Sequence, residues 1–220
     1  MTTHPPPNGP LRRDARRNRA ALLAAAKTAF AEQGLNAALE GIAAKAGVAI
    51  GTLYRHFPTR MDLVGATIAE KKLAWIKAAE AAAVMEPAWD GLTYFLERTC
   101  ELMAGDLAFN DIESMRFPRA PRIEAARKRA DELGRRIVDR AQAEGSLHPD
   151  ITAEDLAFVV WALSRINEAT HTIAPHVWRR YLALTLDGLR ATATHPLPVP
   201  PLRPRQVLRA QLHLGRRRLR

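Results

Sequence analysis

The chain has 220 residues, enough for one large domain, or a small domain joined to a medium one, with a sizeable core. Ala and Leu dominate while β-branched and aromatic residues are sparse, which favours helix. The single cysteine, Cys100, excludes an intrachain disulfide and fits a reducing compartment. Since the sequence has neither an apolar run of about 18–20 residues nor a secretory signal, we expect a cytoplasmic protein without a membrane partner.

The net charge of +10 is concentrated at the two ends of the chain. Residues 1–60 carry nine Lys and Arg against three Asp and Glu, and residues 61–202 carry seventeen against twenty. Residues 203–220 carry seven Arg and no acidic residue. A near-neutral body between two basic ends favours a polyanionic partner, either nucleic acid or an anionic membrane surface.

The first expected element is a disordered arm over residues 1–15, because this stretch holds four prolines and a glycine near its start. Apolar residues at helical spacing begin near Arg16, and Gly34 is suited to end that helix. A second, short apolar stripe ends at Gly47. A third segment runs from Ile50 to Phe57 and stops before a proline.

Two short helices joined by a tight turn predict a helix-turn-helix over residues 38–57. The first helix would brace against the core, and the second would lie on the surface with a width that fits the major groove of DNA. Gly47 permits the turn because glycine accepts a positive φ. We expect the second helix to be anchored by Val48, Leu53 and Phe57 and to offer its polar groups to DNA through Thr52, Tyr54 and Arg55.

Two features of this region each allow two interpretations. Ile50 either packs inward or meets a thymine methyl group. The arginines before and in the first helix are either a solvated run or an arm that contacts phosphates or the minor groove; they are Arg12, Arg13, Arg16, Arg17 and Arg19.

The rest of the chain predicts a helical body. Thr59, with Asp62 three residues later, forms a capping-box pattern that opens a long fourth helix. Further helices are expected over 88–104, 121–144, 152–173 and 176–193, separated by prolines and glycines. Residues 196–220 begin with a proline-rich stretch, and we expect a disordered tail that adds non-specific affinity for DNA. A solvated tail without contacts and a tail on a membrane surface are the alternatives.

The segment from about Arg17 to Ala66 resembles the DNA-binding domain of the TetR family nearly throughout. The matching pieces are LLAAAKTAFAEQG, IAAKAGVAIGTLYRHF and PTRMDLV. The resemblance implies an all-α protein with a three-helix helix-turn-helix domain over 16–75, joined by a long helix to a regulatory and dimerisation domain over 76–195. The DNA contacts that it implies fall on Ala49, Ile50, Gly51, Thr52, Tyr54, Arg55, His56 and Arg60.

The chain departs from the family pattern at two positions. Many relatives have Ser where this chain has Ala49, and Thr or Ser where it reads Ala38 and Leu39. Alanine cannot cap a helix, which costs about 0.5–2 kcal/mol locally. One hydroxyl contact to phosphate is therefore missing on each side of the motif.

The C-terminal half resembles the family in EGSLHPDITAEDLAF and WRRYLALTLDGLR. The last helix is apolar on most sides and therefore needs to be covered on most sides. We expect two copies of the chain to form a homodimer in which the last two helices of each pack together as a four-helix bundle, through Leu163, Val177, Tyr181 and Leu184. Aromatic and Met side chains of the middle helices are either ordinary core or the lining of an apolar effector pocket. They are Trp75, Trp89, Tyr94, Phe95, Met103, Phe109, Met115, Phe117 and Trp161.

The sequence contains no Cys/His metal cluster, HExxH, phosphate loop or GxSxG, so we expect no enzyme activity, no catalytic residue, no metal and no cofactor. Cys100 is expected to be a core thiol, with a redox sensor as the alternative. The favoured function is a sequence-specific DNA-binding regulator, a repressor released from operator DNA by a small apolar or amphipathic effector. The alternatives are a constitutive architectural DNA-binding protein and a helical enzyme or carrier.

Overall fold

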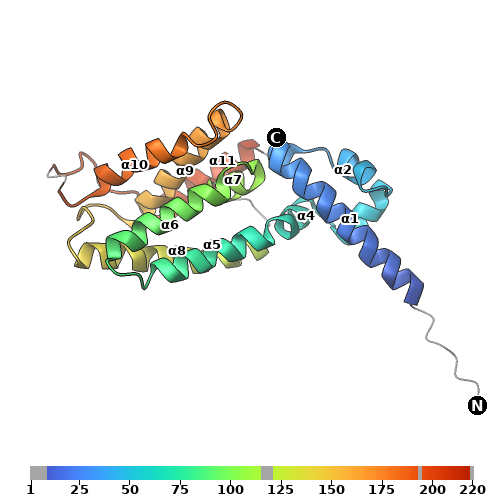
Figure 1. Cartoon of the computed structure of the whole chain (residues 1–220), viewed down its shortest axis with the longest axis horizontal. Helices are drawn as coiled ribbons and strands as arrows, with labels where there is room; N and C mark the ends of the chain where they lie inside the picture. The colour runs from blue at the N-terminus through green and yellow to red at the C-terminus, as the bar shows by residue number, and fades with distance from the viewer. Residues whose placement is uncertain (1–8, 115–120, 193–194, 219–220) are drawn as a thin grey trace, which may run out of the picture.

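The computed structural model describes residues 9–114, 121–192 and 195–218, and Figure 1 shows that they form a small lobe and a larger one. The small lobe contains α1 (Gly9–Gln33), η1 (Gly34–Asn36), α2 (Leu39–Lys45), α3 (Ile50–His56) and α4 (Arg60–Thr67). The larger lobe contains α5 (Ala69–Ala82), α6 (Ala88–Met103), α7 (Leu107–Ser114), α8 (Pro121–Ala143), α9 (Ala153–Thr170), α10 (Trp178–Leu189) and α11 (Pro204–Arg218). The expected all-α class is confirmed, since the described residues contain one isolated β-bridge and no strand.

Helix α1 begins earlier than the sequence indicates. The expected disordered arm covers residues 1–15, but residues from Gly9 onwards are helical, which corrects its C-terminal half; residues 1–8 lie outside the described part of the chain. Proline is compatible with the first turn of a helix, and the Leu, Arg and Ala residues that follow Pro10 are good helix formers. The exposed first half of α1 therefore extends beyond the lobe (Figure 1).

The predicted helix-turn-helix is formed by α2 and α3. Gly47 has a φ of +70° at the turn between them, the left-handed conformation that glycine adopts without a steric penalty. Leu53 and Phe57 are buried, and Val48 packs on the same core, which confirms these three anchors. Their burial fixes α3 against α1 and α2 and leaves the opposite side of α3 exposed.

The expected fourth helix is divided into α4 and α5 by a bend at Ile68, which has φ −93° and ψ −1°. Its start is as predicted: Thr59 and Asp62 form the complete capping box. The bend follows Gly65 and Thr67, which are both weak helix formers. Thr67 donates its hydroxyl to the Val64 carbonyl at 2.8 Å. This bend marks the passage from the small lobe to the larger one.

The larger lobe contains the four expected helices as α6, α8, α9 and α10, and a further helix, α7, that the sequence did not indicate. Asp106 accepts a hydrogen bond from the backbone N–H of Phe109 at 2.9 Å, which stabilises the start of α7. Helices α5 and α6 approach closely at Gly91, where a Cβ would lie 2.4 Å from the Ala82 carbonyl oxygen. One continuous hydrophobic core runs from α1 to α10.

The C-terminal tail contradicts the expectation of disorder over residues 196–220. Residues 204–218 form α11, which packs against α9. Val207 and Gln211, one helical turn apart, are buried, and Leu214 packs on the core. The segment has too little apolar surface to fold alone, but the body of the protein supplies a surface that covers this stripe. No helix of the described residues has both the length and the apolar character needed to cross a membrane.

Candidate nucleic-acid interface and regulatory cavity

The outer face of α3 presents polar groups and one aromatic ring to solvent. Tyr54 is 46% exposed, Arg55 and Gly51 are exposed, and Thr52 and His56 are half-buried. Ile50 is partly buried and packs against the core, which favours the inward interpretation of this residue. The face has the composition and the support of a surface that reads a DNA groove.

Arg55 lies along its own helix. Its Nε donates to the Gly51 carbonyl at 3.3 Å, and its Nη2 donates to the Thr52 hydroxyl at 3.2 Å. Both contacts are exposed, so a base edge or a phosphate can replace them at little cost. At the start of the helix, Ala49 makes no side-chain capping hydrogen bond, and Ala38 makes none at the start of α2.

Gly51 faces open space, and the same is true of Gly41 on the supporting helix α2. A Cβ added at either position would meet no atom within 4 Å, and neither glycine has a positive φ. The fold therefore requires glycine at neither position. At Gly51, on the exposed face of α3, the missing side chain instead allows the backbone to approach a partner closely.

Arg60 is held by the protein itself. Its Nη1 donates to the carbonyl oxygens of Leu35 and Ala37, and the guanidinium is partly buried. These carbonyls follow α1, so Arg60 fastens the start of α4 to the loop before α2. Guanidinium has five N–H donors, and those that remain can still face a phosphate.

The arginines of α1 are exposed along the first half of the helix. Arg17 pairs with Asp14 at 3.3 Å, and the Arg19 guanidinium lies 5.1 Å from the centre of the Phe57 ring. Arg19 thus lies beside the C-terminal end of α3. Arg19 therefore adds a positive charge beside α3, a helix that contains no acidic residue.

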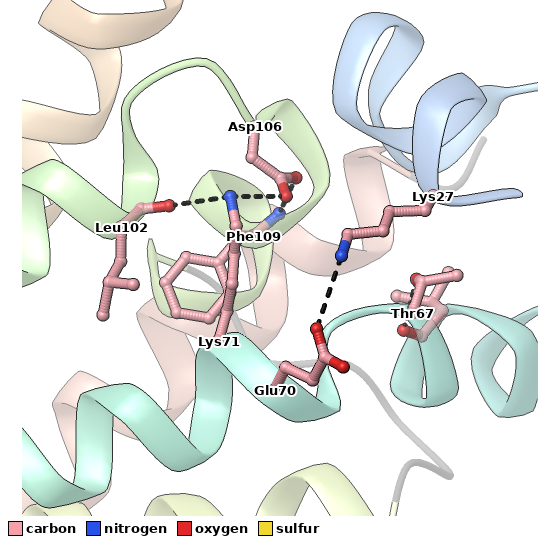
Figure 2. A network of polar contacts seen from close by, with 8 residues as sticks. Lys27, Thr67, Glu70, Lys71, Leu102, Asp106 and Phe109 are labelled. Carbon is pink, nitrogen blue, oxygen red and sulfur yellow. Dashed lines mark hydrogen bonds and ion pairs between the residues drawn. The ribbon is translucent and has the colours of Figure 1, made fainter. Parts of the chain in front are cut away.

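A polar network joins the two lobes at the bend before α5 (Figure 2). Lys71 pairs with Asp106 at 2.8 Å and donates to the Leu102 carbonyl at 3.2 Å. Its ammonium lies 5.8 Å from the centre of the Phe109 ring. Lys27 of α1 pairs with Glu70 at 3.4 Å. Since α7 also packs on α1 and η1, the start of α5 is fixed to both the small lobe and α7.

The neighbouring Lys72 makes the buried ion pair of this region. Its side chain is 8% exposed, that of Glu113 is 1% exposed, and the two lie 2.9 Å apart. The Lys72 ammonium also lies 3.6 Å from the centre of the Trp75 ring. Breaking such a pair leaves a buried charge without its partner, which is strongly destabilising. Two consecutive lysines at the start of an apolar helix were the only sequence signal for this network, and we drew no prediction from them.

A cavity lies in the larger lobe between α8 and α9, with α11 across it. It has a volume of about 150 Å³ and borders Trp75, Phe95 and Glu113. The lining from the later helices comprises Asp131, Gly134, Arg135, Ala153, Glu154, Leu156, Ala157, Val160, Pro204, Val207, Leu208 and Gln211. Aromatic rings on one side and charged side chains at the edge suit an amphipathic molecule.

Two of the nine side chains proposed for an effector pocket, Trp75 and Phe95, line this cavity. Four others pack in the core without reaching it: Trp89, Tyr94, Met103 and Phe109. Met115 and Phe117 lie outside the described residues. Trp161 does not pack against the main core and instead contacts Phe158, with ring centroids 5.7 Å apart. Glu113 and the α11 residues are lining groups that sequence reasoning missed.

Helix α10 leaves an apolar face uncovered. Leu184 is 56% exposed, Tyr181 is exposed, and Val177 is half-buried beside them. Leu163, expected at the same interface, is buried inside the subunit, so its place there is corrected. The helical spacing places Leu163 on an apolar face of its helix, but it does not determine whether that face packs on the core of the same subunit or on a second chain.

Cys100 is buried in α6, and burial, together with the carboxylates of Glu101 and Glu97, raises the pKa of its thiol to about 12. The Arg179 guanidinium opposes this shift of the pKa. A thiol that stays protonated is a poor nucleophile, which fits a core residue better than a redox sensor. Among the described residues, no three His, Cys, Asp or Glu side chains are grouped to hold a metal ion.

Comparison with protein families gives two matches along the chain. Residues 22–67 match the model of bacterial regulatory proteins of the tetR family, and residues 87–191 match the C-terminal domain of SbtR-like transcriptional regulators. The first match contains α2, α3 and their turn, and the second contains most of the larger lobe. No curated protein matches the chain.

Several solved structures have a similar fold, and the similarity extends over almost the whole length of each solved chain. The ketosteroid transcriptional regulator KstR2 of Mycobacterium tuberculosis is 23% identical with a TM-score of 0.59, covering 78% of this chain and 94% of its own. A tetR-family regulatory protein from Rhodococcus RHA1 has the same identity and TM-score, covering 78% and 96%. SmeT, the repressor of a multidrug efflux pump of Stenotrophomonas maltophilia, is 21% identical with a TM-score of 0.55, covering 82% and 97%. At these identities the likeness shows a shared fold.

Proposed function

Because the chain belongs to the TetR family of DNA-binding transcriptional regulators, which are not enzymes, we propose that it is a repressor controlled by a small molecule. An apolar or amphipathic effector would bind in the cavity between α8 and α9 and release the protein from its operator. The observation that carries this proposal is the position of Trp75, which lines the cavity and belongs to the helix that continues, through one bend, into the DNA-facing lobe.

The proposed DNA contacts divide between bases and phosphates. Arg55, which is exposed, and Thr52, which is half-buried beside it on α3, are proposed to read base edges. Tyr54 and the free N–H groups of Arg60 are proposed to hold phosphates, which fix the register of the helix without carrying sequence information. The arginines at the start of α1 would add phosphate or minor-groove contacts beside α3.

We propose a homodimer formed by α9 and the uncovered face of α10. Leu184 and Tyr181 expose apolar surface on α10, and the half-buried rings of Trp161 and Phe158 contact each other on α9. A two-fold axis between these helices would place two α3 helices on one DNA duplex. The operator would then be near-palindromic, with half-sites about one helical turn or more apart.

The contacts of α5 supply a route from the cavity to the DNA. Trp75 lines the cavity, and Lys72 connects that ring to Glu113, which lines the cavity as well. One residue earlier, Lys71 holds Asp106 at the start of α7, and α7 packs on α1. An effector that displaces Trp75 therefore acts on α5 and α7 together, and through them on the separation of the two α3 helices. It can shift the equilibrium only by its difference in affinity for the two arrangements.

The test is to fill the cavity from within the protein. Ala157 lines it from α9, and Ala157→Phe would occupy effector volume while leaving α3 untouched. An operator fragment is first selected from random-sequence DNA, and compounds that release the wild-type protein from it are then identified. We expect Ala157→Phe to bind the operator normally and to need much higher concentrations of these compounds. Release at unchanged concentrations would place the effector elsewhere, and a complete lack of releasing compounds would favour a constitutive DNA-binding protein.

A further inference from the structure

The proposed effector cavity is bordered on one side by a helix that lies outside the matched regulatory domain. The family match ends at residue 191, and α11 covers Pro204–Arg218. Figure 1 shows α11 in red beside α9. Pro204, Val207, Leu208 and Gln211 of α11 border the same cavity as Trp75 and Phe95. A segment beyond the common domain thus lies in contact with the site that we assign to the effector.

The attachment of α11 is narrow. Val207 and Gln211 are 7% and 6% exposed, Leu208 between them is 41% exposed, and Leu214 is partly buried against the core. The connection over residues 195–203 is exposed throughout. His195 and Leu197 near its start contact His148 and Asp150, and at its end the Arg203 backbone N–H donates to Gln206 of α11 itself. Elements with few buried apolar contacts open at low free-energy cost. Helix α11 can therefore leave the bundle while the rest of the core stays intact.

The space that remains beside α11 is small. The cavity of about 150 Å³ holds roughly one aromatic ring, whereas sites for ordinary small ligands measure about 300–1,000 Å³. Val207, Leu208 and Gln211 form the wall of this cavity on the side of α11, which packs on α9. An effector larger than one aromatic ring needs the volume that these side chains occupy.

We propose that α11 is a built-in competitor of the effector, which binds by displacing it. This inference rests on the proposed function only in assigning the cleft to an effector. The ligand would be a multi-ring or chain-like amphipathic molecule, with its apolar body on Trp75 and Phe95 and its polar end near Arg135 and Glu154. The apparent Kd rises as the fraction of molecules with an open cleft falls, so α11 sets the concentration at which the regulator responds.

The experiment removes α11 from the cleft in the full-length chain. Val207→Asp places a charge in the apolar contact, and His213→Asp, on the exposed side of the same helix, is the matched control. The probe is N-phenyl-1-naphthylamine, a neutral fluorophore with three aromatic rings. If α11 is docked in about nine molecules of ten, Val207→Asp lowers the Kd of the probe about tenfold, and His213→Asp leaves it unchanged. Equal or weaker binding by Val207→Asp overturns the proposal.

Two further measurements guard against a variant that fails to fold or binds the probe elsewhere. A synthetic peptide of residues 204–218 should displace the probe from the Val207→Asp protein, whereas the same peptide with aspartate at position 207 should not. In the wild-type protein, the probe should accelerate hydrogen exchange of the amides of residues 207–214, and unchanged protection at saturation contradicts displacement. Release of operator DNA is measured separately. If the probe competes with α11 but does not release operator DNA, only the proposed function is refuted. If operator DNA is released at the same effector concentration from Val207→Asp and from the wild type, only the role of α11 is refuted.

Discussion

Replacing Gly51 with alanine separates the requirements of folding from those of DNA contact. The fold has no need of glycine at this position, because an added Cβ would meet no protein atom within 4 Å and the backbone is helical. Alanine is favoured over glycine inside a helix by about 0.5–1 kcal/mol. For a chain of this length, that gain corresponds to a rise in Tm of about 1–4 °C. The free protein should therefore become slightly more stable.

Binding to DNA should change in the opposite direction. If the backbone of α3 approaches the duplex at Gly51, the added methyl group occupies space that a phosphate or base edge needs. Loss of one good contact in such an interface costs about 1–3 kcal/mol, so the operator Kd should rise about fivefold to more than a hundredfold. Stability and affinity would then move in opposite senses after a change of one methyl group.

Gly41→Ala is the matched control, because Gly41 is also exposed, helical and surrounded by open space, but lies on the supporting helix α2. Both variants should show the same small rise in Tm by calorimetry. Fluorescence anisotropy with an operator selected from random-sequence DNA should show weaker binding only for Gly51→Ala. An operator affinity of Gly51→Ala equal to that of the wild type would show that α3 does not approach DNA at this position.

Four other variants or measurements test separate parts of the molecule. Arg55→Ala should cost about 1–3 kcal/mol of operator binding and relax sequence preference in competition with random DNA; an intact preference would refute its base contact. Arg60→Ala should weaken binding to all sequences alike and also lower Tm, because two carbonyl groups lose their donor. Leu184→Asp should give a 24.4 kDa monomer in light scattering while the wild type is a dimer, and a monomeric wild type would contradict the proposed interface. Burial raises the pKa of Cys100 from 9.0 to about 12, so its thiol should resist disulfide reagents at pH 8 until the chain unfolds. By the same shift of the pKa, the neutral thiol stabilises the fold below pH 9, and this contribution is lost as the pH rises towards 12.

The helix-turn-helix was predictable because its determinants are local. Gly47 fixes the turn, Thr59 and Asp62 fix the start of α4, and the spacing of Leu53 and Phe57 gives the buried side of α3. Each of these signals acts within a few residues along the chain. Arg60 is the exception in this region, because the carbonyls that hold it come from residues more than twenty positions earlier, and no spacing rule connects them.

The cavity and α11 show what a periodic pattern leaves undetermined. Periodicity indicates that one side of a helix is apolar, but the partner that covers this side depends on how distant helices cross. Trp75 and Phe95 reach the cavity, whereas Phe109, equally apolar in the sequence, packs in the core. Val207 belongs to a stripe too short to support a helix in isolation, and it is buried because α11 packs on α9 beside the cavity. A helix that depends on a cleft for its order is also the element that another occupant of that cleft would most readily displace.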